Sequence, residues 1–295
     1  MAEPERLASL VFRRIFWRST AVNVLVMGLA WTYGAIGVPT PAGEASRMAA
    51  VPLIVAVGAA YFGGGLLLQR GVLRVRFRPI AAWLATDGPP IEAVRSRLFG
   101  FSWWFARLLY VLWIVAALME ASLALRFYPL GVIPAGLAVG ILFVGLIACT
   151  LSFLLTENAM RPVYERALRW DPSPPSARGE VLRRLMLSWC FSSGAFLLLS
   201  ILGPIVLRET SQFSQLRTLI FLNSGLGIAV GIVSILFASR TLTDRLKALR
   251  DAQVRVEQGD LSAQVAVDDR GELGMLLAGF NRMVAGLRER EHLHD

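Results

Sequence analysis

Five polar residues stand inside long apolar stretches of the chain and are the first candidates for chemistry: Asn23, Arg107, Glu120, Glu157 and Asn223. Polar side chains are costly in apolar surroundings, so each one is a candidate functional residue. We expect the two asparagines to form hydrogen bonds between helices and the arginine to extend its charge to a lipid headgroup. Glu120 lies near the outer end of its stretch, and Glu157 stands where it can cap a following helix. The five form no catalytic motif, and we predict no catalytic residue in the chain.

Cysteine and histidine are too scarce to build a metal centre or a disulfide framework. Cys149 and Cys190 fall inside apolar stretches, and the two histidines, His292 and His294, stand at the end of the chain. The cysteines are therefore expected to be small core residues in a reduced setting. We predict no metal and no cofactor in this chain.

The composition indicates a membrane protein. Hydrophobic residues make up 55% of the chain and charged residues 17%, with a mean hydropathy of +0.57. Average soluble domains carry about 25% charged residues, so an ordinary soluble domain is excluded. The net charge of +9 fits the basic cytoplasmic loops of a membrane protein, and we expect no nucleic-acid partner.

Six apolar stretches are long enough to cross a bilayer, which needs about 20 residues each. Arginines precede the first stretch, so it is expected to be a retained span without cleavage as a signal peptide. The expected spans are Ser19–Val38, Met48–Leu68, Phe101–Leu123, Leu130–Leu155, Leu185–Leu207 and Thr218–Ser239.

Arginine placement predicts the orientation. Arginines are frequent before the first span and in the loops after the second and fourth, whereas the opposite side has only Arg47, Arg126, Arg208 and Arg217. Positive loops stay in the cytoplasm, so we predict a multi-pass protein of the bacterial plasma membrane with both termini cytoplasmic. The outer loops are too short to fold as a ligand-binding domain, so any input must come through the membrane or the inner face.

A weak internal repeat marks the ends of the helical hairpins. Arg78-Pro79, Arg161-Pro162 and Arg240-Thr241 each follow an even-numbered span. Proline suits the first position of a helix, so each hairpin is expected to lead into a short cytoplasmic helix. The alternative is that there is no repeat, because any helical hairpin with arginines at its inner ends shows the same sequence pattern. The run Gly63-Gly64-Gly65 is expected to let a neighbouring helix approach closely.

Two amphipathic helices joined by an extended connector are predicted after residue 239. A heptad-like spacing places one apolar stripe on each helix. Gly259 is expected to end the first helix as its C-terminal cap, and 260–267 reads as extended. The expected core residues are Leu242, Leu246, Leu249 and Val256 of the first helix, Leu261 and Val265 of the connector, and Leu273, Leu276, Phe280, Met283 and Leu287 of the second helix.

The two stripes cannot bury each other completely within one chain. A parallel homodimer with four helices around one axis would bury both, so we expect a homodimer.

This segment resembles the HAMP domain, a relay between membrane spans and cytoplasmic output modules. The residues that carry the resemblance are Gly259-Asp260-Leu261, Gly271-Glu272-Leu273-Gly274 and Phe280-Asn281-Arg282-Met283. Gly259, Glu272 and Gly274 are the motif positions. One departure is that Thr241 stands where HAMP segments usually begin with a proline. The alternative is an ordinary coiled-coil linker, which needs neither the glycine connector nor the helix restart.

The whole chain, with six spans followed directly by HAMP, resembles the membrane half of the mycobacterial-type class III adenylate cyclases of actinobacteria. The sharpest local parts are the HAMP motifs, the Arg161-Pro162 exit and the charged ending 286–295. The resemblance implies a membrane domain, 1–239, and a HAMP domain, 240–295, that regulate a C-terminal cyclase domain absent from this chain. Mg or Mn with ATP is expected only in that missing domain, so the chain alone should not make cyclic AMP.

Two other functions stay open at this point. The chain can be the sensor half of a histidine kinase, which differs only in the missing domain. A transporter or channel is disfavoured because no set of ionisable residues surrounds a midplane cavity and no broken helices are evident. Besides the bilayer, the expected partners are a lipid or fatty-acid ligand or another membrane protein, and no motif separates them.

Overall fold

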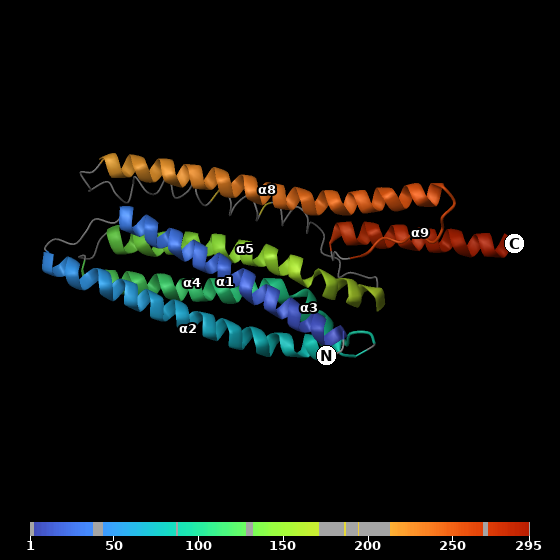
Figure 1. The fold of residues 1–295 in the computed structure, drawn as a ribbon, viewed down its shortest axis with the longest axis horizontal. Coiled ribbons are helices and arrows are strands. Elements are labelled where there is room, and N and C mark those ends of the chain that lie inside the picture. The colour runs from blue at the N-terminus through green and yellow to red at the C-terminus, as the bar shows by residue number, and fades with distance from the viewer. Residues whose placement is uncertain are drawn as a thin grey trace.

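The computed structural model describes residues 3–37, 44–86, 88–127, 132–170, 213–267 and 271–294, with the single residues 186 and 194. This part of the chain is helical, with no strand, so the all-α class is confirmed. The helices are α1 (Glu3–Gly37), α2 (Glu44–Leu84), α3 (Glu92–Phe99), α4 (Phe101–Ala124), α5 (Val132–Trp170), α8 (Phe213–Glu257) and α9 (Glu272–His294) (Figure 1).

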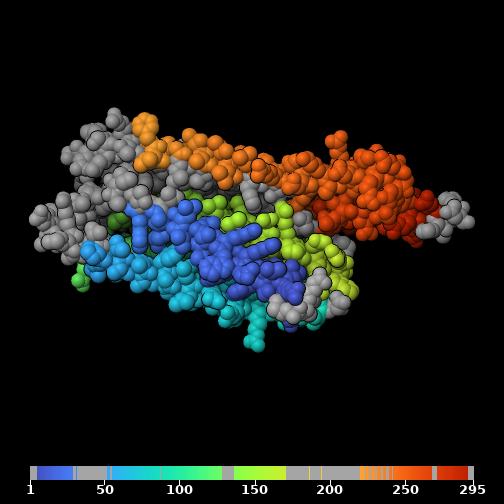
Figure 2. All heavy atoms as spheres, viewed as in Figure 1, coloured from blue at the N-terminus to red at the C-terminus, as the bar shows by residue number. Residues whose placement is uncertain are grey.

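Four long helices form a bundle. The helix α5 packs against α4 and α1, and α2 lies against α1 and α4. The helix α8 runs alongside this bundle and contacts α1. The C-terminal end of α8 and most of α9 extend beyond the bundle (Figures 1 and 2). Because α8 is continuous, the predicted domain boundary at residue 239 falls inside a helix.

Two of the described helices have the length and apolar composition of a membrane span: α4, and residues Gly136–Trp170 of α5. In these apolar windows 22% and 33% of the residues are buried, and the other side chains are at least partly accessible. The predicted spans 19–38, 48–68 and 218–239 fall almost wholly within α1, α2 and α8, and the span 185–207 lies outside the described residues apart from the single residues 186 and 194. Six spans thus stay a prediction.

The short cytoplasmic helices predicted after the hairpins are wrong as separate elements. The helix α2 continues through Pro79 to Leu84, and α5 continues through Pro162 to Trp170. A proline removes one helical hydrogen bond, and packing of the following turns holds the helix together. Glu157 lies inside α5, so it caps no following helix.

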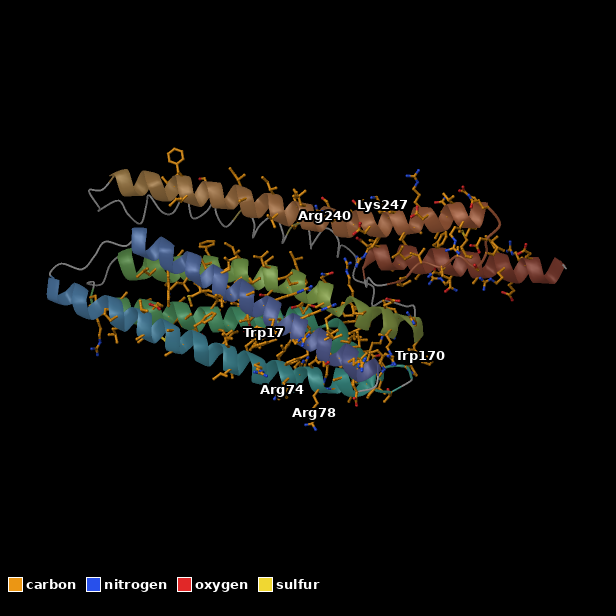
Figure 3. The ribbon with its side chains drawn as sticks, in the orientation of Figure 1. Trp17, Arg74, Arg78, Trp170, Arg240 and Lys247 are labelled. Atoms are coloured by element: carbon orange, nitrogen blue, oxygen red, sulfur yellow. The ribbon has the colours of Figure 1, made fainter. Side chains whose placement is uncertain are left out.

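Together with parts of α1, α3 and α4, these helix extensions build the largest group of buried side chains in the described residues, which we call the juxtamembrane core. Phe77 of α2 meets Phe101 of α4 edge-on with ring centroids 5.8 Å apart, and Phe99 stacks on Tyr164 at 5.8 Å. The arginines of α2 border this core: Arg74 and Arg78 point away from the bundle (Figure 3). The buried side chains are Val11, Ile15, Leu73, Phe77, Ile80, Leu84, Leu98, Phe101, Met160, Tyr164 and Leu168.

The close helix approach occurs at a different glycine from the ones predicted. A Cβ added at Gly63, Gly64 or Gly65 would meet nothing within 4 Å, so that prediction is wrong. At Gly145 of α5 it would lie 2.5 Å from Cγ of Trp113. The indole of α4 therefore occupies the space that a side chain would need, and this contact sets the distance between α4 and α5.

Candidate functional site

Asn23 is the one predicted polar residue that lies at the centre of the bundle. Its Nδ2 donates to the backbone oxygen of Ser19 at 2.8 Å, and its Oδ1 accepts from Nε1 of Trp113 at 2.9 Å. The interhelical hydrogen bond expected for this asparagine is therefore present, between α1 and α4. Both asparagine and tryptophan are buried, so their polar atoms need these partners.

The hydroxyl of Ser19 extends this contact to two more helices. It lies 3.3 Å from Oγ of Ser152 in α5 and accepts from Nε2 of Gln69 in α2 at 3.2 Å. We call Ser19, Asn23, Gln69, Trp113 and Ser152 the polar cluster. Sequence reasoning found only Asn23, because Gln69 adjoins Arg70 at the end of an apolar stretch and the others pass as ordinary span residues.

The other four polar candidates lie apart from the polar cluster. Arg107 is exposed, and Oε1 of Glu120 lies 3.3 Å from the Cβ position of Gly58. Glu157 is buried and accepts a hydrogen bond from Tyr164 at 3.4 Å. The side chain of Asn223 lies outside the described residues. No group of three metal-binding side chains occurs in the part of the chain that was described.

At the other end of the molecule, α8 ends in a glycine cap. Gly259 has φ +88°, a left-handed conformation that other residues rarely adopt. Its N–H donates to Val256 O at 3.0 Å, and the N–H of Asp260 donates to Arg255 O at 2.9 Å. This pair of bonds is the Schellman motif, and it confirms the predicted end of the helix.

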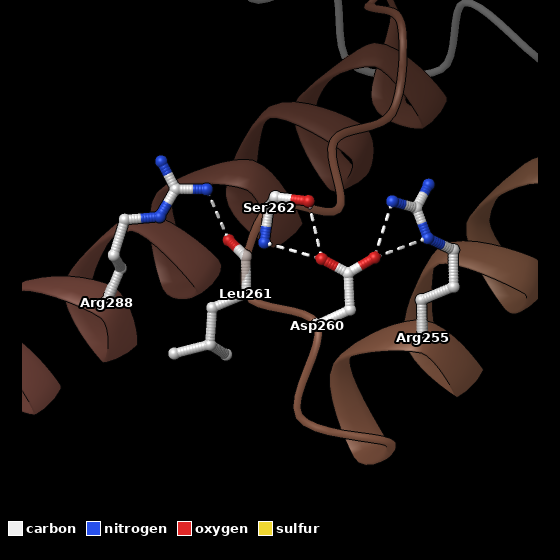
Figure 4. Close-up of polar contacts among 5 residues, drawn as sticks. All are labelled: Arg255, Asp260, Leu261, Ser262 and Arg288. Carbon is white, nitrogen blue, oxygen red and sulfur yellow. Dashed lines mark hydrogen bonds and ion pairs between the residues drawn. The ribbon is translucent and has the colours of Figure 1, made fainter.

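Asp260 stabilises the turn that follows by hydrogen bonds to residues on both sides of it. Its Oδ2 accepts from Nε of Arg255 at 2.8 Å and from the second guanidinium nitrogen at 2.6 Å (Figure 4). Its Oδ1 accepts from the backbone N–H of Ser262 at 3.0 Å and from the Ser262 hydroxyl. The Ser262 hydroxyl first, and Arg255 next, lower the pKa of Asp260 from 3.8 to about 2.

Asn281 of α9 holds the connector by its backbone. Its Oδ1 accepts from Val265 N at 2.9 Å, and its Nδ2 donates to Val265 O at 2.8 Å. The side-chain amide thus pairs with the extended segment as a neighbouring strand would. Arg288 adds a third tie by donating to Leu261 O at 2.5 Å (Figure 4). The resemblance pointed to Asn281, whereas Arg288 was missed because its partner is a backbone carbonyl.

A small apolar core lies between the two helices and the connector. Ala252 of α8, Ala263 and Val265 of the connector and Leu277 of α9 are buried there. Leu249, Val256 and Phe280 pack against it. Leu273 is buried as well, and Leu261 is half-buried. Leu277 was not among the predicted core residues, because the heptad count placed the inner stripe of α9 one position away, at Leu276. Ala263 of the connector was not predicted either.

The remaining predicted core residues form an outer stripe that the single chain leaves exposed. Leu276 and Met283 of α9 are 52% and 53% exposed. They recur at heptad spacing on the face of α9 turned away from Leu277. The full outer stripe is Leu242, Leu246, Leu276, Met283 and Leu287.

Val267 contacts both the helix bundle and the HAMP-like segment. This half-buried residue packs against both the small core of the connector and the juxtamembrane core. In Figure 1 the connector passes beside the C-terminal end of α5 before α9 begins. The connector therefore touches the bundle directly, in addition to its covalent link through α8.

Comparison with known proteins assigns the C-terminal segment. Residues 237–289 match the HAMP domain family, so the chain carries a HAMP domain. Within it, Gly259 caps α8, Glu272 begins α9, and Gly274 is buried. HAMP domains relay signals, so the chain is a signal-transduction module with candidate membrane helices.

Partial similarity extends to mycobacterial proteins. The chain is 39% identical over 155 residues to the uncharacterized protein Rv1320c of Mycobacterium tuberculosis, covering 52% of this chain and 27% of that protein. It is 33% identical over 157 residues to Rv1318c of the same organism, covering 52% and 29%. The match thus spans less than a third of each relative's length. No solved structure matches the chain.

Proposed function

We propose that this chain is the membrane-anchoring and regulatory module of a larger signalling protein, and that it controls a C-terminal adenylate cyclase domain through HAMP. In this proposal six spans hold both termini in the cytoplasm, and two copies pair through HAMP and the membrane helices. The chain itself performs no chemistry and holds no cofactor. Mg or Mn with ATP belongs to the output domain.

The observation that carries the proposal is the outer stripe. Five large apolar side chains on α8 and α9 are exposed in a single chain, although the inner faces of the same helices are packed. A second copy in parallel would bury both outer stripes in a four-helix bundle. The stripe begins at Leu242, two residues after Arg240, so the paired region follows directly on the predicted sixth span.

Continuity of α8 supplies the relay. The helix runs unbroken for 45 residues from Phe213 to Glu257. A rotation or shift of its predicted membrane half therefore moves the HAMP half as a rigid rod. The ties of the connector to α9 at Asn281 and Arg288 pass this movement to α9, which leads toward the C-terminus. Coupling of this kind is typically worth about 1–3 kcal/mol, which changes activity severalfold.

A cyclase output is favoured by the sequence resemblance described above. The matched mycobacterial relatives are longer than the region they share with this chain, so there is room for an output domain. A histidine kinase output would use the same relay.

The functional test changes the rotation of the HAMP half of α8 relative to its predicted membrane half, and we call it the phase experiment. Residues 1–295 are fused to a class III cyclase catalytic domain, and cyclic AMP formation is compared with versions carrying one or seven residues inserted after Ser239. One residue turns the HAMP half of α8 by about 100°, whereas seven turn it by about 700° and nearly restore the phase. We expect a severalfold change with one residue and recovery with seven. Equal cyclic AMP formation in every version would mean that the chain only anchors the output domain and does not regulate it.

Topology is tested separately by thiol labelling. In a background with Cys149→Ser and Cys190→Ser, Leu125→Cys lies after α4 and Gln258→Cys lies after α8, both at exposed positions. Because both termini are proposed to be cytoplasmic, an impermeant reagent should label only Leu125→Cys in intact cells. Labelling of Gln258→Cys in intact cells would show that the orientation is opposite to the proposed one.

A further inference from the structure

A small cavity lies beside the polar cluster, between α1, α2 and α4. Its volume is about 40 Å³, and it is partly open to the outside of the bundle. Asn23 and Gln69 line it with amide groups, and Tyr61, Phe62 and Trp113 supply aromatic walls. Gly65 of α2 lines it as well, and here the absent side chain leaves the space open.

The amide of Gln69 is only half used. The residue is 2% exposed, and its Nε2 donates to Ser19. Its carbonyl oxygen makes no hydrogen bond within the described part of the chain. This oxygen is not one of the fully enclosed polar atoms that lack a partner, so it is still accessible to a small molecule. Because Gln69 lines the cavity, its oxygen can accept one more hydrogen bond there.

The lining decides which group fits. The described residues that line the cavity include no Asp, Glu, Lys, Arg or His, so an ionised ligand would find no counter-charge. A water molecule needs a cavity of roughly 10–15 Å³, so this space has room for a hydroxyl group. An alkyl tail on that hydroxyl would leave through the opening, along apolar walls.

We propose that this cavity binds a single neutral hydroxyl group, carried by a membrane-soluble alcohol or by a water molecule. The hydroxyl donates to the free oxygen of Gln69, at the centre of the polar cluster. An alcohol binds with its tail toward the bilayer, and water binds alone.

The position of the cavity gives binding a route to the relay, and this step alone rests on the proposed function. The helix α2 runs from Gly65 to Leu84 without a break, and Leu73, Phe77 and Ile80 on it belong to the juxtamembrane core. That core touches Val267 of the connector. A ligand that wedges between α2 and its neighbours therefore shifts the surface on which the connector rests.

Two glycines of α2 provide a matched pair of variants. Gly65→Ala adds a methyl group at a residue that lines the cavity, without meeting any atom within 4 Å, and so it reduces the space. Gly64→Ala makes the same chemical change at an exposed position. Both replace glycine by alanine in a helix interior, so their effects on helix propensity are alike. Gln69→Met is the third variant, which keeps the length of the side chain and removes its hydrogen bonds.

The experiment measures the melting temperature of the full-length chain in nanodiscs against rising n-hexanol, with n-hexane as the probe without a hydroxyl. We expect hexanol to raise the melting temperature of the wild type and Gly64→Ala by about 3 °C at a concentration of about ten times its dissociation constant. Gly65→Ala and Gln69→Met should not respond, and hexane should have no effect on any of them.

The outcomes separate the two sources of the hydroxyl. If hexanol has no effect but Gly65→Ala melts below Gly64→Ala, the cavity holds water. If neither effect is seen, or if Gly65→Ala responds to hexanol as the wild type does, the cavity is a packing gap and the proposal is overturned. This readout does not involve HAMP output, so it can succeed or fail independently of the phase experiment.

Discussion

Asn281 is the residue on which the fold of the connector depends most. It satisfies both the N–H and the C=O of Val265 with one side chain, where a strand partner would otherwise be needed. Its presence in the sequence motif shows that it matters, but only the structure shows that its partner is the backbone of the connector.

Asn281→Ala should destabilise the HAMP segment by about 1–3 kcal/mol for each backbone group left unpaired. Asn281→Asp should also destabilise the segment, because its second oxygen would face the carbonyl oxygen of Val265 and cannot donate to it. Thermal unfolding of the full chain measures the loss, with the exposed neighbour Arg282→Ala as control. Equal melting of Asn281→Ala and Arg282→Ala would show that the connector is held by other contacts.

Asp260 makes stability depend on pH. Its folded pKa of about 2 lies below its ordinary value of 3.8, so its contribution is present above about pH 4 and is lost as the pH falls toward 2. The difference in melting temperature between wild type and Asp260→Asn should therefore be constant above pH 5 and shrink below pH 4.

The matched control for this profile is Asp251→Asn, which removes an exposed carboxylate of α8 outside the Arg255–Ser262 clamp. It should follow the wild-type acid profile. An unchanged difference between wild type and Asp260→Asn down to pH 2.5 would mean that the clamp adds nothing to folding.

At the scale of elements, apolar runs and glycine signals predicted most helices but not where they meet. Gly259 was found because a cap needs a left-handed residue next to a break in periodicity. Gly145 and Trp113 were missed, since nothing in either stretch says which helix is its neighbour. The prolines at 79 and 162 misled for a similar reason: tertiary packing, which a local pattern does not contain, carries both helices through them.

Gly145→Ala tests the contact between α4 and α5. The added methyl would overlap the indole of Trp113, and overpacking of this kind typically costs about 1–3 kcal/mol. The melting temperature should fall, whereas Gly140→Ala, on the same helix with nothing within 4 Å, should leave it unchanged or raise it. The double variant Gly145→Ala with Trp113→Leu should lose less than the sum of the two. If the losses of the two single variants add exactly in the double variant, the destabilisation by Gly145→Ala does not come from overlap with Trp113.

At the scale of the whole molecule, the end of the helix bundle that lies next to HAMP forms one packed unit with the connector. Val267 contacts both cores, so the bundle reaches HAMP by two routes: through the rod of α8 and through the connector. The sequence predicted a HAMP helix directly after the last expected span, and the structure joins the two as the single helix α8. The sequence could not predict the second route, because Val267 lies more than 90 residues from α5 in the chain.

The central claim is that the outer stripes of two copies close a parallel four-helix bundle. The most direct measurement is disulfide cross-linking of full-length chains in membranes, at Met283→Cys and, as its matched control, at the exposed neighbouring position Arg282→Cys. Both are made in the Cys149→Ser, Cys190→Ser background. Met283 lies on the outer stripe, and Arg282 is turned from it by about 100° around α9. We predict rapid cross-linked dimer at Met283→Cys and little at Arg282→Cys, whereas equal cross-linking at the two positions would contradict the bundle.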